Sequence, residues 1–339
     1  MEYKRLGLSG LLVSELCLGT MIFGEDSSRS TPPDEAEQII ASYLEAGGNH
    51  IDTANVYASG RAEEIVGRAL RGKRGQAVLA TKVRFAMGSG PNDQGLSRYH
   101  IFRSVEDSLR RLKTDSIDLL YMHCWDPLTP LEESLRAFDD LVSSGKVRYI
   151  GVSNFKAWQL MKALGISDAH GWARFISVQY QYSLVVRDIE REFLDLCESE
   201  SVGIVPWGPL GGGFLSGKYR PVQRPQHAAN GRLATTPDHD EEAWIRRSNE
   251  KNWRIMEVVE TVISGHPGAT PSQVALAWLL ARPAVDSVVL GVRTMEQLLD
   301  NLGAADLQLS PDEMARLDAV SALEDSYPYR FIELYGARK

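Results

Sequence analysis

Residues 145–154 read Gly145-Lys146-Val147-Arg148-Tyr149-Ile150-Gly151-Val152-Ser153-Asn154, and this stretch contains the unit that decides the fold. Its centre, 147–153, is a mostly apolar run of the length of one strand, and polar residues follow where the run ends. The segment before it, 131–144, has the apolar spacing of a helix. A nearly continuous apolar run is typical of a parallel strand that is covered on both faces.

The same unit recurs over almost the whole chain. The runs that predict strands are 16–20, 50–53, 77–82, 117–123, 147–153, 175–180, 203–207 and 287–291. The segments that predict helices are 35–46, 62–71, 101–112, 131–144, 157–164, 189–199, 242–263, 272–281 and 295–302. Eight strands, each followed by a helix, predict an α/β fold that closes into a (β/α)8 TIM barrel. An open, doubly wound sheet is the alternative.

Three segments lie outside the repeat. Residues 1–15 are rich in turn-forming residues and predict an N-terminal β-hairpin that closes the bottom of the barrel. Residues 218–240 are polar and aperiodic, which predicts a long functional loop after the seventh strand. The C-terminal tail, 321–339, is unusually aromatic. Because no change of composition marks a boundary, we expect a single domain over residues 1–339.

Composition excludes several classes of function. The 339 residues are 43% hydrophobic and 24% charged, and 37 basic residues face 45 acidic ones, for a net charge of −8. An acidic chain without a clustered basic face does not predict a nucleic-acid partner. No run of 18 apolar residues occurs, so we expect a cytoplasmic protein without a membrane partner. Three isolated cysteines and seven scattered histidines predict no metal site.

Polar residues follow several of the predicted strands. In a TIM barrel, chemistry is placed at the carboxyl ends of the strands. Asp52, Lys82 and His123 end the second, third and fourth strands, and Tyr57 follows in the loop after Asp52. Capping, solvation or core packing could explain each residue alone. Four such groups at one barrel mouth instead predict a reaction site.

A chemical argument connects these four groups. The pKa of an unperturbed tyrosine is about 10, so Tyr57 is a poor acid at neutral pH. Lowering that pKa to about 7 requires roughly 4 kcal/mol of stabilisation of the phenolate. The Lys82 ammonium could supply it, with Asp52 keeping the ammonium charged and His123 donating a hydrogen bond to a substrate oxygen. We therefore predict a site that donates a proton to oxygen while another group arrives at carbon.

Other common site motifs are missing. The chain shows no nucleophile beside a base, no paired catalytic carboxylates and no P-loop. The glycine run Gly211-Gly212-Gly213 is followed by Ser216 where a Rossmann fingerprint requires glycine. A dinucleotide would therefore not bind in the Rossmann manner.

Taken together, the motifs resemble those of the aldo-keto reductases, most closely the bacterial branch that is similar to potassium-channel β-subunits. The resemblance covers essentially the full length and rests on many ordered matches. They are Leu6-Gly7-Leu8-Ser9-Gly10, Leu18-Gly19-Thr20-Met21, Ile51-Asp52-Thr53-Ala54 with Tyr57, Ala80-Thr81-Lys82, Ile117-Asp118-Leu119 with His123, residues 145–154, Gln179, Trp207-x-Pro209-Leu210, Gly217-Lys218-Tyr219 and Gly291-x-Arg293 with Gln297 and Asn301.

The resemblance implies a TIM barrel that binds NADP(H) across the strand ends and reduces aldehydes and ketones to alcohols by reversible hydride transfer. It implies that Tyr57 is the general acid, assisted by Asp52, Lys82 and His123. The cofactor-binding residues that it implies are Thr20, Met21, Asp52, Ser153, Asn154, Gln179, Trp207, Gly208, Pro209, Leu210, Gly211, Gly212, Lys218, Gly291, Arg293, Gln297 and Asn301. Arg293 suits a ribose 2′-phosphate, which favours NADP over NAD.

For the substrate, the resemblance implies a small carbonyl compound or alcohol in an apolar slot. The lining residues would be Met21, Phe23, Tyr57, Phe85, His123 and Trp125, and the aromatic tail would overhang the slot. Related proteins include monomers, dimers and larger rings, so no oligomeric state is implied. The alternative function is a redox sensor that binds the nucleotide but turns over negligibly.

Overall fold

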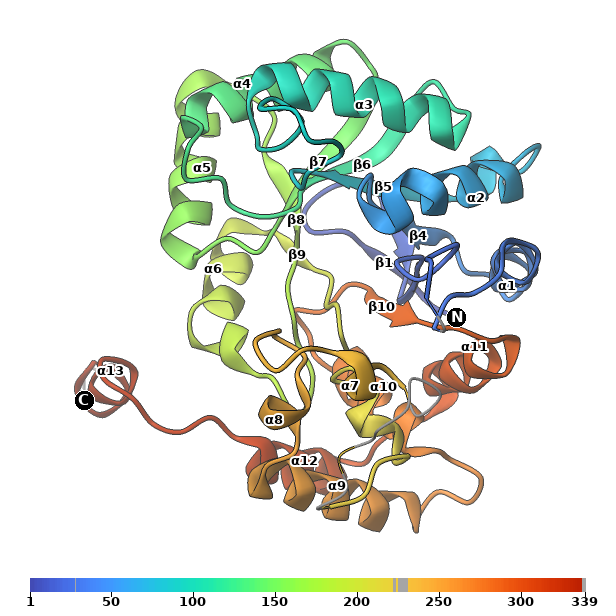
Figure 1. Cartoon of the computed structure of the whole chain (residues 1–339). Helices are drawn as coiled ribbons and strands as arrows, with labels where there is room; N and C mark the ends of the chain where they lie inside the picture. The colour runs from blue at the N-terminus through green and yellow to red at the C-terminus, as the bar shows by residue number, and fades with distance from the viewer. Residues whose placement is uncertain (28, 222–223, 225–230, 337–339) are drawn as a thin grey trace.

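A sheet of eight parallel strands forms the centre of the computed structural model, which describes residues 1–27, 29–221, 224 and 231–336 (Figure 1). The strands are neighbours in the order β10-β3-β4-β5-β6-β7-β8-β9. Their bounds are β3 Leu16–Gly19, β4 His50–Asp52, β5 Val78–Val83, β6 Ile117–Met122, β7 Val147–Ser153, β8 Phe175–Gln179, β9 Gly203–Ile204 and β10 Val288–Gly291.

The sheet closes between its first and last strands. Ile204 forms a parallel bridge with Val285, and the Val289 N–H donates a hydrogen bond of 2.9 Å to the Pro206 carbonyl. This closure confirms the predicted TIM barrel, and the alternative prediction of an open, doubly wound sheet is wrong.

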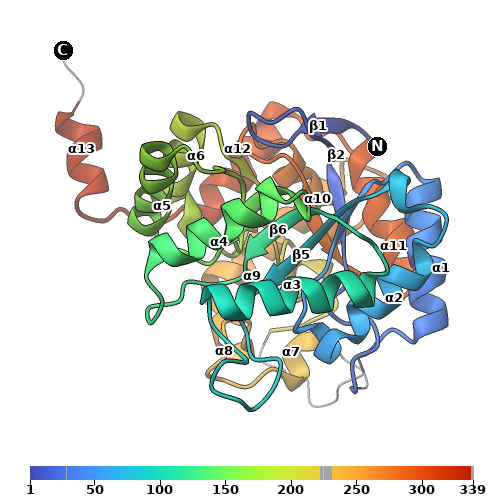
Figure 2. The same ribbon diagram turned by 90° about the horizontal axis from the view of Figure 1, so that it is seen from above.

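Helices surround the strands on the outside (Figure 2). The α-helices of the described residues are α1 Pro33–Glu45, α2 Arg61–Ala69, α3 Arg98–Leu112, α4 Leu131–Ser143, α5 Ala157–His170, α6 Phe193–Glu200, α7 Arg232–Thr235, α8 Trp244–Arg247, α9 Glu250–Ile263, α10 Pro271–Leu280, α11 Met295–Leu302, α12 Pro311–Ser321 and α13 Tyr329–Tyr335. The 3-10 helices are η1 Tyr57–Gly60, η2 Arg74–Gln76, η3 Asp188–Arg191, η4 Phe214–Ser216 and η6 Gly303–Asp306. None of the helices within these ranges combines the length and the apolar character that crossing a membrane requires.

The alternation of side chains along β5 separates two hydrophobic layers. Leu79 and Val83 belong to the large core between the strands and the helices, whereas Ala80 belongs to a smaller cluster with Leu119 and Tyr121. Successive side chains of a strand point to opposite faces. Lys82, two residues after Ala80, therefore points to the same side as that smaller cluster, near the carboxyl end of the strand.

The N-terminal hairpin closes the end of the barrel at which the strands begin, as predicted. Strands β1 (Tyr3–Arg5) and β2 (Leu12–Ser14) pair antiparallel. The Gly7 N–H donates to the Asp286 carboxylate at 2.8 Å, and the Leu8 N–H donates to the Ser201 carbonyl at 2.9 Å. Gly7 has a φ of +55°, and a Cβ there would lie 2.5 Å from the Ile176 carbonyl oxygen, so only glycine fits.

Several predicted elements differ from the structure, among them the helix over 189–199, which is divided into η3 and α6. The helix predicted over 242–263 is interrupted, because the Asn249 side chain accepts a hydrogen bond of 2.9 Å from the Asn252 N–H and starts α9 as a new helix. The strand predicted over 203–207 ends at Ile204. Pro206 has no N–H to donate, which prevents a regular ladder there.

The C-terminal tail does not overhang the barrel mouth, so that prediction is wrong. Helix α13 projects away from the rest of the molecule, and Tyr335 is 71% exposed (Figure 1). Two contacts direct the chain along η3 and α6 instead. Arg191 donates to the Ser326 hydroxyl at 2.7 Å, and Tyr329 donates to the Glu192 carboxylate at 2.9 Å. Residues 337–339 of the predicted tail lie outside the described residues.

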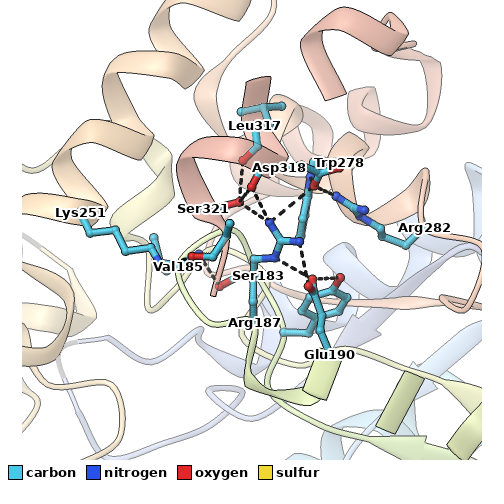
Figure 3. A network of polar contacts seen from close by, with 12 residues as sticks. Ser183, Val185, Arg187, Glu190, Lys251, Trp278, Arg282, Leu317, Asp318 and Ser321 are labelled. Atoms are coloured by element: carbon cyan, nitrogen blue, oxygen red, sulfur yellow. Dashed lines mark hydrogen bonds and ion pairs between the residues drawn. The ribbon is translucent and has the colours of Figure 1, made fainter. Parts of the chain in front are cut away.

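Arg187 attaches α12 to the segment that follows β8 (Figure 3). Its guanidinium donates two hydrogen bonds of 2.7 Å to the Glu190 carboxylate and one of 2.7 Å to the Ser321 hydroxyl. The side chains of Arg187 and Glu190 are only 10% and 17% exposed. Removing one partner of a buried ion pair leaves the other charge uncompensated.

The substitution Arg187→Met should therefore lower the free energy of unfolding by about 3 kcal/mol or more. We expect the thermal unfolding midpoint to fall by several degrees, measured by circular dichroism. Arg316→Met, which removes an exposed arginine from the same helix α12, serves as the control and should melt like the wild type. Equal midpoints for the two variants would contradict a stabilising role for the Arg187 network.

Candidate active site

A cleft of about 630 Å³ opens at the carboxyl ends of the barrel strands. This volume lies within the range of small-molecule and cofactor sites. The lining residues are Gly19, Thr20, Met21, Ile22, Arg29, Asp52, Val56, Tyr57, Phe85, His123, Ser153, Asn154, Gln179, Trp207, Gly208, Pro209, Leu210, Gly212, Gly213, Ser216, Lys218, Gly231, Arg232, Glu242, Ser272, Val289, Gly291, Arg293, Gln297, Asp300 and Asn301.

Lys82 stands at the base of the cleft as a fully enclosed ammonium. Its Nζ lies 2.5 Å from Asp52 Oδ1 and donates to the Thr53 carbonyl at 2.9 Å and to the Tyr57 hydroxyl at 3.2 Å. The second carboxylate oxygen of Asp52 accepts a hydrogen bond of 2.9 Å from Gln179 Nε2. The structure therefore brings Asp52, Tyr57 and Lys82 together, from β4, η1 and β5.

These contacts set the protonation states of the site. Burial lowers the pKa of Lys82, but the Asp52 carboxylate and Tyr57 outweigh burial, and the pKa of Lys82 is raised. Burial also raises the pKa of Tyr57, and this effect exceeds the opposing effect of Lys82. The expected lowering of the Tyr57 pKa is therefore not found, because the enclosure that strengthens the ion pair also disfavours a phenolate. At neutral pH, Lys82 is charged and Tyr57 is protonated.

An unusual turn fixes the position of Tyr57. The two residues after it, Ala58 and Ser59, have φ angles of 48° and 56°, and Gly60 follows with 95°. Left-handed backbone in residues other than glycine costs free energy and is found at functional sites. A Cβ on Gly60 would lie 2.8 Å from the side chain of Arg111, so α3 packs closely against this turn.

His123 lies beside Tyr57 at the end of β6. The two ring centroids are 5.8 Å apart, and the Phe85 ring contacts His123 edge-on with centroids 4.7 Å apart. Burial, with smaller contributions from Lys82 and Arg84, lowers the pKa of His123 well below its ordinary value. The imidazole is therefore neutral at pH 7, and a neutral imidazole can donate one hydrogen bond.

Three polar residues continue the site along the next strand ends. The Ser153 hydroxyl donates to the Gln179 carbonyl at 2.6 Å, and the Asn154 amide donates to the His123 carbonyl at 2.9 Å and to Ser153 Oγ at 2.8 Å. Asn154 has a φ of 56° and is a third strained residue near the cleft, after Ala58 and Ser59. Together with the Gln179–Asp52 bond, these contacts make one network from β4 to β8.

The far part of the cleft is shaped for an anion. Gly208 and Gly212 line the cleft with φ angles of 64° and 70°, a left-handed backbone that glycine adopts readily. Burial and the nearby Arg293 lower the pKa of Lys218, so two unneutralised cations lie close together. Neither forms an ion pair with any residue that the structure describes. An anionic ligand would relieve their repulsion.

Helix α11 contributes a polar face at that end. Gln297 and Asn301 line the cleft together with Asp300, and Gln297 Oε1 accepts a hydrogen bond of 2.8 Å from the Arg293 N–H. The sequence interpretation missed Asp300. Its position at i+3 from Gln297 places it on the same helical face, a signal that could have revealed it.

Glu242 and Arg232 were also missed. Glu242 is 1% exposed, lines the cleft and forms an ion pair of 2.7 Å with Arg232. Arg232 comes from the aperiodic loop 218–240, and Glu242 stands at the start of the predicted helix 242–263, where no helix is found. Of the predicted loop 218–240, Lys218, Gly231 and Arg232 line the cleft, residues 232–235 form the short helix α7, and residues 222–223 and 225–230 lie outside the described residues.

Three predicted site residues are not brought to the cleft. Phe23 is completely buried in the core between strands and helices. Trp125 instead packs edge-on against Phe155, with ring centroids 5.0 Å apart. Gly211 faces Val185, and a Cβ there would lie 2.6 Å from the valine side chain. Phe23 and Trp125 therefore pack against other side chains, and Gly211 is not among the residues that line the cleft.

Comparison with known proteins gives consistent matches. A family model described as "Aldo/keto reductase family" matches residues 15–322. The uncharacterized oxidoreductase YrpG of Bacillus subtilis (strain 168) is 39% identical over 331 residues, covering 94% of this chain and 96% of that protein. Norsolorinic acid reductase stcV of Emericella nidulans is 34% identical over 336 residues, covering 96% and 82%. A probable voltage-gated potassium channel subunit beta of Arabidopsis thaliana is 35% identical over 333 residues, covering 94% and 96%.

The buried Lys82–Asp52 pair makes a prediction about stability. Lys82→Met leaves the Asp52 carboxylate buried without its counter-ion, which should cost about 3–5 kcal/mol in the free energy of unfolding. Adding Asp52→Asn removes that unpaired charge, so the double variant should regain part of the loss. Urea unfolding of the wild type, both single variants and the double variant measures this. A double variant less stable than Lys82→Met would show that charge compensation is not the reason.

Proposed function

The chain belongs to the aldo/keto reductase family of oxidoreductases, and we propose that it reduces aldehydes and ketones to alcohols with NADPH as the hydride donor. The observation that carries the proposal is the Tyr57 hydroxyl, which lines the cleft and lies 3.2 Å from the buried Lys82 ammonium. Relatives with names that describe reductases, such as norsolorinic acid reductase, support the general reaction.

The cleft residues fit a dinucleotide. Lys218 and Arg293 would bind phosphate groups, and the open backbone at Gly208 and Gly212 would approach the pyrophosphate. Gln297 and Asn301 on α11 would contact the adenosine end. The nicotinamide end would be held by Ser153, Asn154, Gln179 and Trp207. When bound, the reduced nicotinamide supplies the hydride.

Tyr57 then protonates the carbonyl oxygen. Its high pKa keeps the phenol protonated until negative charge develops on the substrate oxygen, which becomes more basic than a phenolate as the hydride arrives. Lys82 stabilises the phenolate that remains, and Asp52 keeps the ammonium charged and in place. The neutral His123 orients the carbonyl by donating a hydrogen bond, which also stabilises the developing charge.

Tyr57→Phe removes only the hydroxyl that we propose as the acid. We expect aldehyde-dependent oxidation of NADPH to fall by at least about a hundredfold, because positioned general acids contribute about 10²–10⁴-fold. Binding of NADPH, followed by quenching of protein fluorescence, should change by no more than a few-fold.

Retained turnover in Tyr57→Phe would remove Tyr57 from its role. A wild-type protein that binds NADPH tightly but reduces none of a panel of aromatic aldehydes, ketosugars and polycyclic ketones would instead support a nucleotide-binding sensor. The similarity to a potassium channel subunit makes that outcome informative.

Arg293→Ala tests the preference for NADPH. Truncating one partner of a buried charge pair costs about 2–5 kcal/mol, so NADPH affinity should fall steeply. NADH lacks the 2′-phosphate, and its affinity should barely move. Arg254→Ala, which removes an exposed arginine of α9, is the control. Equal losses for the two nucleotides in Arg293→Ala would contradict binding of the 2′-phosphate by Arg293.

A further inference from the structure

Arg84 is a cation next to the reaction centre that the proposed reaction does not use. It follows β5 directly, two residues after Lys82. Its guanidinium lies over the Phe85 ring, 5.3 Å from the centroid, and Phe85 in turn contacts His123 and lines the cleft. One aromatic ring thus separates the guanidinium from the imidazole that faces the carbonyl.

The Arg84 guanidinium lacks an acceptor among the residues that the structure describes. It takes part in none of the hydrogen bonds or ion pairs found there, and its Nε is enclosed without a partner. The charge of Asp126 interacts with that of Arg84, but the Asp126 carboxylate already accepts hydrogen bonds from other groups. The carboxylate of Asp126 accepts hydrogen bonds from the Leu96 and Leu128 N–H groups and from the Thr129 hydroxyl.

The backbone around Arg84 is held in place. The Gly95 N–H donates a hydrogen bond of 2.7 Å to the Arg84 carbonyl, which closes the loop after β5 back onto the strand end. A Cβ on Gly95 would lie 2.8 Å from Asp126 Oδ2, so the same acid packs against this loop. A guanidinium on a fixed backbone and stacked on a ring is pre-organised for a ligand.

We propose that Arg84 binds a carboxylate group of the substrate, so that the preferred substrates are aldehydes or ketones with a carboxylate beyond a flat, apolar spacer. The spacer would lie along Phe85, with the carbonyl at Tyr57 and His123. This inference rests on the proposed function, because it places the reacting carbonyl at those two residues.

The chemistry of the two groups favours a carboxylate over a neutral polar group. A planar guanidinium presents two parallel N–H donors that match the two oxygens of a carboxylate. The contact with the Phe85 ring does not use the N–H donors of the guanidinium as hydrogen-bond donors to a carboxylate would. The outer N–H groups of the guanidinium also make no hydrogen bond within the described residues, so a ligand that supplies two acceptors to them gains affinity.

The test compares 4-carboxybenzaldehyde with benzaldehyde as substrates of the NADPH-loaded enzyme. In Arg84→Met, the ratio of the two kcat/KM values should fall about tenfold to a hundredfold, the range for a lost hydrogen bond to a charged group. The loss should appear mainly in KM for the carboxylated substrate, because this contact is remote from the reacting atoms. Arg84→Lys, which keeps the charge but not the planar fork, should show a smaller fall.

Arg136→Met is the matched control. Arg136 is also stacked on an aromatic ring, that of Trp172, but it lies on the outer helix α4. This variant should leave the ratio unchanged. An unchanged ratio of the two kcat/KM values in both Arg84 variants would overturn the proposal. An equal loss of kcat/KM for both aldehydes, together with weaker NADPH binding, would also overturn it, because Arg84 would then bind a phosphate of the nucleotide.

A binding experiment separates this inference from the proposed reaction. Calorimetry with benzoate and the protein loaded with NADP should show binding to the wild type that is lost in Arg84→Met. If the wild type reduced neither aldehyde, the proposed function would be contradicted. The binding of benzoate would still show whether Arg84 binds a carboxylate. Equal benzoate affinity in the wild type and Arg84→Met would overturn the carboxylate site.

Discussion

An ammonium ion enclosed between a carboxylate and a phenol is the interaction on which the site depends. Lys82 is 1% exposed, and its contacts to Asp52 and Tyr57 replace the water that a charged group normally requires. Without its counter-ion, the buried Lys82 charge would lower the stability of the fold strongly. The pair is therefore stable only while both Lys82 and Asp52 are present. The strained turn after Tyr57 and the hydrogen bond from Gln179 to Asp52 hold these three groups in place.

The barrel explains why these groups meet. Residues two apart on a strand point to the same side, so Ala80 packs in the small cluster below while Lys82 reaches Asp52 and Tyr57 at the mouth. Closure of the sheet then brings the ends of β4 and β8 within one hydrogen bond, from Gln179 to Asp52. The longer connection after β9 supplies Lys218 and the buried Glu242 at the other end of the cleft, and the loop after β10 supplies Arg293.

Much of this could be predicted from the sequence, and the limits have physical causes. Because a parallel barrel places its chemistry at the strand ends, the apolar runs alone predict that Asp52, Lys82 and His123 lie together, and the structure has them at the ends of β4, β5 and β6. No such rule gives the direction of a side chain in the loop after a strand. Phe23 and Trp125 therefore pack against other side chains and do not line the cleft. A segment without periodicity gives no indication of its contacts, which explains why the sequence does not reveal Arg232 or the course of the C-terminal tail. Glu242 is missed for another reason, because the helix predicted to start at that residue does not form there.

The protonation state of Tyr57 is also a property that the sequence alone does not predict. Sequence predicts a nearby cation and therefore a lower pKa, but only the structure shows that burial outweighs that cation. The most direct measurement is an alkaline titration of the phenolate absorbance, taken as the difference between the wild type and Tyr57→Phe. The structure predicts that Tyr57 keeps its proton beyond about pH 10, the ordinary pKa of tyrosine. A phenolate that forms at neutral pH would contradict the account of an enclosed, protonated donor.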